Sequence, residues 1–594
     1  MVPRMIGTLV SYEAECRTTG EFCRNLGKQE NARIDYFKNS YPPPRLRFAI
    51  DYKDDPNGKA KSLMLFTLIY PSKTLRDLYN PIRCLNEGMP LDQIVKDLEG
   101  KIGEKLGSLD RYLDSDDGRE DSRWYYLAPM LLDGVENAQR WLEAYRRRLE
   151  ESGQGKKEGD EIEGQVKDGE QENRKALSDR VKGALANCEE LSELLNGLSN
   201  GDIRLGEQPK KLAETLADMA LGSPAVCAAR GWRDCGEQVG NGQGDKDGTV
   251  ESSEDFVMRA GTEIARGFFT RFNQPETISI IELQYNRSDD DYWKDVLRYC
   301  RDGCFQAMFD EYYAVLREGQ AFVRDERKRG EKILEQMCDA LDYRAVPYSV
   351  DTMASLQEQT PQKGGGAGDA DDSKKPMPMR TYYAVGFIKG KGEEAKVSHR
   401  KDVIRRSFNS PFRPFVLAST SIGQEGLDFH PYCRKIFHWN LPSNPVDLEQ
   451  REGRINRYKC LAVRENIALK YGQMKFEKDV WEEMYKAAQE GVKQEGDSDL
   501  IPFWCLGKDQ EVKIERIVPK YPFSKDVAAY QRLIAILSLY RLSMGQPRQE
   551  ELLESVMKAV PEDDRDQLKQ LFINLSPFSA KQEQGNCHVR NEVV

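Results

Sequence analysis

The clearest signal in the sequence runs from Val416 to Lys459 and reads VLASTSIGQEGLDFHPYCRKIFHWNLPSNPVDLEQREGRINRYK. An apolar run at 415–418 predicts a strand, which leads into a turn of small residues at 419–423. The glycines in and after this turn let a ligand approach the backbone closely, because glycine has no side chain in the way. Strand ends followed by such turns are typical of nucleotide-binding sites.

A second strand is predicted at 435–439, and a helix follows it. Asn444 is a suitable N-cap for that helix, and Pro445 is a suitable first helical residue. Three side chains recur at positions i, i+4 and i+7 and are expected to share one helix face. They are Gln450, Arg454 and Arg457. An amide and two permanently charged, planar guanidinium groups suit a triphosphate whose negative charge grows in the transition state.

Two segments of this stretch resemble motifs of superfamily-two helicases and Swi/Snf-type translocases. Residues 419–428, STSIGQEGLD, resemble motif V, and residues 450–457, QREGRINR, match the motif VI pattern Q-x-x-G-R-x-x-R. The run WNLPSNP at 439–445 resembles the lead-in found in bacterial, RapA-like Swi/Snf ATPases. The resemblance implies an α/β fold, in which a RecA-like second helicase lobe is built on a parallel sheet. It also implies ATP bound between this lobe and a first lobe.

The resemblance further implies a role for each matching residue. Arg454 and Arg457 correspond to arginines that reach the γ-phosphate, and Gln450 corresponds to a glutamine that positions phosphate or the attacking water. These three are the predicted catalytic residues. The predicted nucleotide-binding residues are Gly426, Asp428 and Gly453, and the predicted nucleic-acid contacts are the hydroxyl groups of Ser419 and Thr420.

Each of these roles has a structural alternative. The two arginines can lie on a surface helix and pair with Glu449 or Glu452, since a charge run is usually a solvated helix face. The glutamine can be an ordinary polar helix residue, and the motif V residues can form a plain turn or cap a strand end. His438 falls in a buried-looking strand and is expected to be a core residue.

No phosphate loop and no magnesium-binding acid pair accompany the two motifs in the sequence. The run GKAKS at 58–62 lacks the first glycine of G-x-x-x-x-G-K-[ST] and is predicted to be a surface turn. Asp310 and Glu311 fall inside a helical pattern, not at the end of a strand. The resemblance implies ATP with Mg²⁺, the metal being held mainly by the first lobe. We therefore expect that lobe on another chain or upstream, and expect this chain alone to be incomplete and inactive.

The composition limits the environment in which the chain works. It has 594 residues, 31% of them charged, and a mean hydropathy of −0.69. No apolar run approaches the roughly 20 residues of a membrane span, and the N-terminal residues lack signal-peptide architecture. Thirteen cysteines are scattered without a C-x-x-C pair, which favours buried free thiols over a zinc site. Free thiols fit a reducing compartment. We expect a cytoplasmic protein with no metal of its own and no membrane partner.

The net charge of −11 does not by itself indicate nucleic-acid binding. The charge is unevenly distributed, however, because residues 400–465 carry twelve Lys or Arg and only seven Asp or Glu. A locally basic face can bind phosphate groups on an acidic protein.

Periodicity and composition predict a lobe that is interrupted by a large, mostly helical insertion and followed by a helical extension. The predicted segments are 1–19 (the start of the lobe, its first strand missing upstream), 20–345 (the insertion), 346–379 (a flexible link), 380–474 (the helicase C-terminal lobe) and 475–594 (the helical extension). Within the insertion, the predictions are a strand at 63–70, helices at 91–106 and 135–150, and flexible stretches at 151–175 and 235–254.

The function predicted from these motifs is the C-terminal portion of an ATP-dependent nucleic-acid helicase or translocase, with DNA favoured over RNA. The alternative is a non-catalytic nucleic-acid-binding or scaffolding protein that retains the lobe without a working motor. A neighbouring reading frame with a phosphate loop and an acid pair would favour the first of these.

Overall fold

The structure is a computed structural model that divides into two compact units, Met1–Tyr383 and Ala384–Val594. We describe each unit by itself. The residues described are 63–114, 118–154, 168–234, 252–272, 277, 280–281, 284–285, 291–341, 346–350, 377–381, 403–412, 416–417, 428–493, 497–507, 510–519, 525–539 and 549–561.

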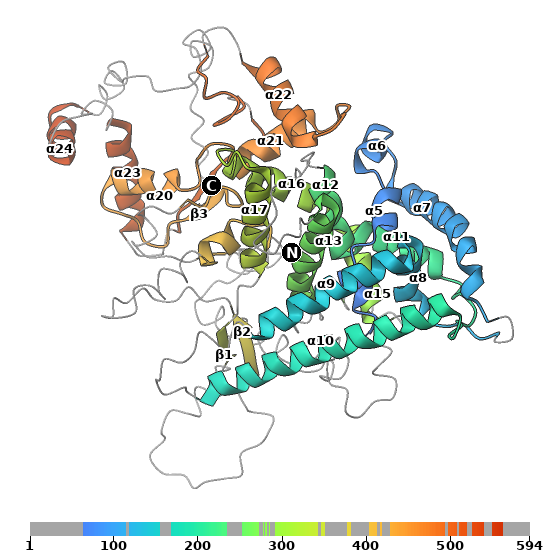
Figure 1. The fold of residues 1–594 in the computed structure, drawn as a ribbon. Helices are drawn as coiled ribbons and strands as arrows, with labels where there is room; N and C mark the ends of the chain where they lie inside the picture. Colours follow the sequence, from blue (N-terminus) through green and yellow to red (C-terminus); the bar gives the residue numbers. More distant parts are fainter. Residues whose placement is uncertain are drawn as a thin grey trace. The chain divides into compact units, whose positions relative to one another are not determined.

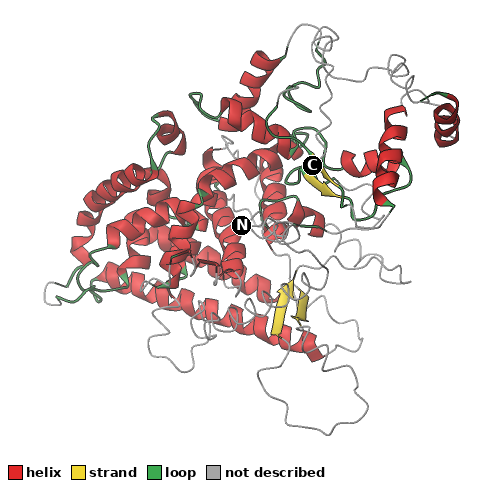
Figure 2. Cartoon of the chain, turned by 180° about the vertical axis from the view of Figure 1, so that it is seen from behind, coloured by secondary structure: helices red, strands yellow, loops and turns green. Residues whose placement is uncertain are grey.

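The first unit is mostly helical, as the ribbons of Figures 1 and 2 show. Its helices are α4 Phe66–Ile69, α5 Lys73–Leu78, α6 Pro81–Asn86, α7 Leu91–Leu106, the 3₁₀ helix η2 Gly107–Tyr112, α8 Trp124–Asp133, α9 Val135–Gln154, α10 Asp168–Asn200, α11 Leu212–Gly222, α12 Pro224–Asp234, α13 Ser253–Phe272, α15 Tyr292–Asp302, α16 Phe305–Gly319 and α17 Glu326–Leu341. The two strands described in this unit, β1 Val346–Val350 and β2 Met377–Thr381, pair antiparallel.

The core of this unit is centred on α11 and α12. Every residue from 215 to 232 is buried, including Ser223 between the two helices. Helix α12 packs against α13, α16, α5 and α4, while α11 packs against α7 and α15. A helix that is buried on all sides lies at the centre of a domain, whereas an amphipathic helix lies at its surface.

The amphipathic helices at the edge of this core were predicted correctly. Helix α7 has the predicted bounds, and its buried residues recur every fourth position because one face meets the core. They are Ile94, Leu98, Ile102 and Leu106. Helix α9 likewise begins at Val135 and continues beyond the predicted end to Gln154.

The strand predicted at 63–70 is wrong, because residues 66–69 form the short helix α4. All four residues of α4 are buried. A segment covered on every side shows neither the alternation of a strand nor the 3.6-residue period of a surface helix, so its sequence pattern does not separate the two.

Part of the predicted flexible stretch 151–175 is also helical. Helix α9 covers 151–154 and α10 begins at Asp168, so the described residues at both ends of this stretch are helical. At the second predicted stretch, 235–254, residues 252–254 are described and lead into α13. The predicted link 346–379 begins and ends in the paired strands β1 and β2. The remaining residues of these stretches lie outside the described ones, as does the whole of the predicted segment 1–19.

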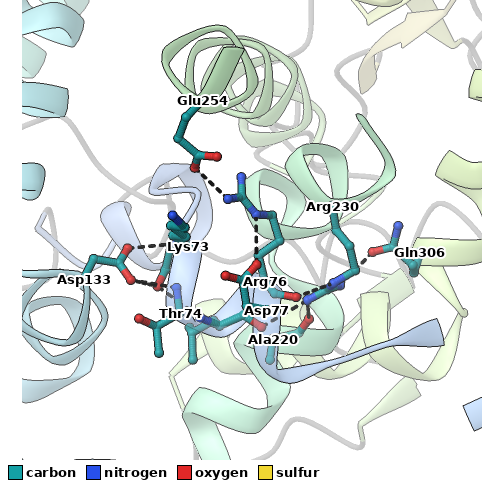
Figure 3. A network of polar contacts seen from close by, with 11 residues as sticks. Lys73, Thr74, Arg76, Asp77, Asp133, Ala220, Arg230, Glu254 and Gln306 are labelled. Atoms are coloured by element: carbon teal, nitrogen blue, oxygen red, sulfur yellow. Dashed lines mark hydrogen bonds and ion pairs between the residues drawn. The ribbon is translucent and has the colours of Figure 1, made fainter. Parts of the chain in front are cut away.

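A buried polar network joins several helices of this unit (Figure 3). Arg230 of α12 is fully buried and donates to the carbonyl oxygens of Arg76 (3.0 Å), Leu75 (3.2 Å) and Ala220 (2.7 Å), and to Gln306 Oε1 (2.7 Å). Its guanidinium group also lies 4.9 Å from the Tyr79 ring centroid. A buried charge is tolerated when it is hydrogen-bonded in this way, so Arg230 links α12 to α5, α11 and α16.

The start of α5 is held by a carboxylate from α8. Asp133 accepts from the backbone N–H groups of Lys73 (2.8 Å) and Thr74 (2.7 Å) and from the Tyr70 hydroxyl (2.9 Å). These interactions satisfy backbone donors that a helix N-terminus otherwise leaves without partners.

The second unit contains residues 416–459, which carry the two predicted motifs. Its elements are β3 Lys435–Phe437, α20 Pro445–Gly453, α21 Leu461–Tyr471, α22 Val480–Val492, β4 Glu515–Ile517, α23 Asp526–Leu539 and α24 Gln549–Ala559. Strands β3 and β4 pair in parallel, with Lys435 opposite Glu515 and Phe437 opposite Ile517. The helices α20, α21 and α22 lie between them in the chain, as a parallel crossover requires.

The C-terminal extension is therefore not purely helical as predicted, because β4 pairs with a strand of the lobe. Of the strand predicted at 415–418, only Val416 and Leu417 are described, and neither is in a strand.

Candidate functional site

The strand–turn–helix frame predicted around β3 and α20 is present. Strand β3 ends at Phe437, and the side chain of Asn444 caps α20 by accepting from the N–H of Val446 at 2.8 Å. Pro445 is the first residue of the helix, as predicted. Leu448 is fully buried and fixes one face of α20 in the unit.

The helix ends earlier than the predicted arrangement of Gln450, Arg454 and Arg457 requires. Its last residue is Gly453, Arg454 is the C-cap, and Arg457 lies beyond the helix. The expectation that these three side chains share one helix face is therefore wrong. The backbone leaves the helix because the Arg454 carbonyl oxygen accepts from the N–H of Phe429 at 2.9 Å.

That pairing brings the end of motif V against the end of motif VI. Asp428 precedes Phe429, and its carboxylate lies 3.2 Å from the Arg457 guanidinium group. Both side chains remain about two-fifths to one-half exposed, at 47% and 41% respectively. The Asp428 carbonyl oxygen also accepts from the side-chain amide of Asn409 at 2.8 Å. Two predicted site residues that are far apart in the sequence thus face each other at a surface open to a ligand.

The loop after Arg457 is fixed by a second set of interactions. The N–H of Leu461 donates to the carbonyl oxygen of His430 at 3.0 Å. Arg464 is buried and donates to the carbonyl oxygens of Lys459 (3.1 Å) and Pro431. These contacts tie α21 to the segment that follows motif V, so the positions of Asp428 and Arg457 are determined together.

His430 lies beside this ion pair and is uncharged near neutral pH. Burial, aided by the positive charges of Arg464 and Arg457, lowers the pKa of its imidazole to about 4, although Asp428 acts in the opposite direction. A neutral imidazole leaves the positive charge at this place to the arginines.

Glu452, one of the two acidic residues that the structural alternative offered as partners for the arginines, is held by residues outside motif VI. Its carboxylate accepts from Arg516 of β4, with distances of 2.5 and 2.7 Å, and lies 3.3 Å from Nε2 of His438. Burial acts to raise the pKa of Glu452, but the hydrogen bonds with His438 and Arg516 outweigh it and lower the pKa to about 2. This carboxylate joins the end of α20 to both strands of the sheet.

His438 is buried, as predicted for a core residue, and its contact with Glu452 was not predicted. Arg516 was missed altogether, because the three-residue strand that carries it has no pattern of its own in the sequence. The signal for both residues lies in the sheet pairing, which the sequence does not reveal.

The other predicted site residues are placed as follows. Gln450 is exposed on α20, and a Cβ atom added to Gly453 would meet nothing within 4 Å, so that position is open. Ser419, Thr420 and Gly426 lie outside the described residues.

Within the part of the chain that the structure describes, no group of three or more His, Cys, Asp or Glu side chains is arranged to hold a metal ion. No helix among those described is long and apolar enough to cross a membrane. The site presents the Arg457 guanidinium group, which fits phosphate oxygens, beside the Asp428 carboxylate.

Residues 379–459 match the helicase conserved C-terminal domain. This match ends two residues beyond Arg457 and supports a helicase C-terminal lobe in this part of the chain. The domain implies a RecA-like fold, to which the described parallel pair β3–β4 corresponds only loosely. Comparisons with curated proteins and with solved structures gave no match.

Proposed function

We propose that residues 380–474 act as the second lobe of an ATP-driven helicase or translocase of the Swi/Snf type. ATP is bound between this lobe and a first lobe that is supplied by another chain or by further sequence. The first lobe holds most of the Mg²⁺ ligands. The assembly binds nucleic acid in the cytoplasm and moves along it, with DNA favoured over RNA.

The observation that carries this proposal is the contact between Asp428 and Arg457. Motif V and motif VI are matched on independent segments, and their charged side chains lie 3.2 Å apart inside the region that matches the helicase domain. An exposed ion pair of this kind contributes little to stability, on the order of 0–1 kcal/mol. It leaves a guanidinium group at the surface that exchanges its carboxylate partner for phosphate at small cost.

ATP hydrolysis transfers the γ-phosphoryl group to water, and negative charge develops on the departing oxygens. Arg454 and Arg457 would bind these oxygens, and their charge counts most in the transition state. Gln450, which is exposed on α20, would orient phosphate or the attacking water. Asp428 would hold Arg457 in position until nucleotide arrives, and Gly453 would leave room beside the arginines.

Reconstitution tests this proposal directly. The full chain is assayed for ATP hydrolysis alone, and then with single- or double-stranded DNA and a protein carrying the G-x-x-x-x-G-K-[ST] loop encoded beside this gene. We expect negligible turnover alone and DNA-stimulated turnover with the partner. Robust turnover by the chain alone would contradict the need for a separate first lobe. DNA binding with no turnover in any combination would favour the scaffolding function instead.

A further inference from the structure

A row of three aromatic rings lies directly after motif VI. Tyr458 packs on Phe503, with ring centroids 5.4 Å apart and planes 30° apart, and Phe503 stacks on Tyr485 at 6.2 Å and 18°. The ammonium group of Lys459 lies 4.3 Å from the Tyr485 centroid, 5.4 Å from Tyr458 and 5.6 Å from Phe503. We call the three rings together with Lys459 the aromatic row. They come from three separate segments: the loop before α21, helix α22 and the turn at 501–504.

The aromatic row runs from the interior of the unit to its surface. Tyr485 is 8% exposed, Phe503 is half-buried and Tyr458 is 40% exposed. The innermost ring, Tyr485, is almost fully covered, whereas the outermost ring, Tyr458, packs on Phe503 and keeps a large exposed fraction. Tyr458 is therefore a flat apolar surface that is already held in place.

The backbone at Lys459 is held in an unusual conformation that fixes this arrangement. Its φ angle is +49°, in the left-handed region that non-glycine residues rarely adopt. Two hydrogen bonds hold it there: its N–H donates to the Phe503 carbonyl oxygen at 2.8 Å, and its carbonyl oxygen accepts from Arg464 at 3.1 Å. Strained backbone of this kind occurs preferentially at binding sites. The strain here has the effect of placing Tyr458 at the surface and the Lys459 charge beside it.

The chain segment around and after Tyr458 is basic. Residues 456–475 carry five Lys or Arg and one acidic residue. Lys470 and Lys475 are exposed on and just after α21, and the Lys470 ammonium lies 5.5 Å from the Tyr471 ring centroid. Exposed aromatic rings beside cations are the means by which proteins bind single-stranded nucleic acid, since a ring stacks on an unpaired base and the cations attract the phosphates.

We infer that Tyr458, supported by Phe503, Tyr485 and Lys459, is a stacking site for an unpaired base of single-stranded nucleic acid. The inference rests on the proposed helicase function, and it adds a contact that lies outside the two motifs. A duplex keeps its base faces covered by neighbouring base pairs, so an interior duplex base has no face free for Tyr458. A strand leaving or entering a duplex offers such a face.

The test measures binding of the full chain to a fluorescein-labelled oligo-dT and to a matched duplex by anisotropy, in the absence of ATP. Tyr458→Ala and Tyr458→Leu should weaken oligo-dT binding by roughly 5- to 100-fold, the range that loss of one base–aromatic stack produces. Tyr458→Phe keeps the ring and should bind like the wild-type chain. Duplex binding should change much less. Phe322→Ala is the matched control, because Phe322 is an aromatic residue of the first unit with 98% exposure.

A second measurement detects the stack itself. An oligonucleotide with 5-iodouracil forms a photo-cross-link with an aromatic ring stacked on the base, and mass spectrometry should locate that link at Tyr458. Wild-type affinity in a folded Tyr458→Ala variant would overturn the inference, as would a cross-link at Trp439 instead, or no binding of oligo-dT at low salt.

The outcomes separate this inference from the proposed function. Loss of binding in Tyr458→Ala together with normal ATP turnover of Arg454→Ala in the reconstituted assembly would sustain the stacking site and refute the motif VI assignment. The reverse pattern would refute the stacking site alone.

Discussion

Arg230 of the helical unit and Arg457 of the helicase-like unit are used in opposite ways. In the helical unit, Arg230 is fully buried and all of its hydrogen-bond donors that are described go to fixed acceptors on other helices. In the helicase-like unit, Arg457 is 41% exposed and reaches a carboxylate that is itself half exposed. Arg230 is bound to buried acceptors and is not available to a ligand, whereas Arg457 can exchange its carboxylate partner for a ligand. The difference shows that burial and the rigidity of the acceptors distinguish a structural arginine from a candidate for catalysis.

The largest effect is expected when the motif VI arginines are removed from a complete assembly. Arg454→Ala or Arg457→Ala should lower the rate of ATP hydrolysis on the order of a thousandfold, with a smaller effect on nucleotide affinity, because these groups meet charge that develops in the transition state. Lysine should restore little activity, since it lacks the planar fork of guanidinium. The rates are measured at saturating ATP and DNA with the first-lobe partner present.

Circular dichroism checks that both variants fold. Folded variants with near wild-type turnover would show that motif VI is only a charged surface here. Arg457 would then have no catalytic role to contrast with the structural role of Arg230.

Removal of the buried arginine should instead act on stability. Arg230→Ala leaves the carbonyl oxygens of Leu75, Arg76 and Ala220 without their donor in the core, so we expect the free energy of unfolding to fall by about 3 kcal/mol. Urea denaturation measures this loss. Arg457→Ala is the control and should change stability by less than about 1 kcal/mol, as is usual for an exposed ion pair. Equal losses in the two variants would contradict the distinction between the units.

The sequence predicted some parts of this comparison and not others. Helix α7 and the Asn444 cap were correctly predicted because both depend on local signals, a one-sided apolar period and a capping side chain. The early end of α20 was missed, because it depends on pairing with Phe429. The alternative that paired the arginines with Glu449 or Glu452 was also local, and it did not foresee that Arg516 reaches the Glu452 carboxylate from a strand far along the chain.

Sequence motifs likewise identified Asp428 and Arg457 as members of one site, but the 3.2 Å contact between them follows from the fold. The role of Arg230 had no sequence signal, since its acceptors are mostly backbone carbonyl oxygens. Any residue type supplies such an acceptor, so no pattern of side chains marks the network in advance.

A third prediction concerns the carboxylate that anchors α20. The pKa of Glu452 is lowered from 4.5 to about 2, so its charged form stabilises the folded state above pH 4.5 and this contribution is lost as the pH falls through that range. Glu452→Gln should cost on the order of 2 kcal/mol at pH 7, allowing for partial exposure to solvent. The difference in unfolding free energy between the wild-type chain and E452Q should shrink as the pH falls from 4.5 towards 2.

Urea denaturation at a series of pH values provides this measurement, with Glu449→Gln as the control because Glu449 is exposed on the same helix. A difference that stays constant with pH would mean that the ion pair with Arg516 does not anchor α20.

The smallest effect on stability is expected at a glycine. Gly453 is the last residue of α20, and a Cβ atom added there would meet nothing within 4 Å. Gly453→Ala should therefore leave the free energy of unfolding unchanged or raise it by up to about 1 kcal/mol, because alanine loses less backbone entropy in a helix. In the helical unit, a Cβ atom on Gly261 would lie 2.8 Å from the Ala225 carbonyl oxygen and 3.1 Å from the Ala229 Cβ atom.

Gly261→Ala should therefore destabilise the chain by about 1 kcal/mol or more, through crowding between α12 and α13. The two substitutions are chemically identical, so a difference between their effects on unfolding free energy reflects the surroundings of each glycine. If Gly453 keeps space for nucleotide beside Arg454, then Gly453→Ala should lower ATP turnover in the assembly while the unfolding transition stays where it was. Among the described residues, no neighbouring atom requires a glycine there, so full activity of Gly453→Ala would remove this residue from the proposed site and leave the motif VI arginines as its support.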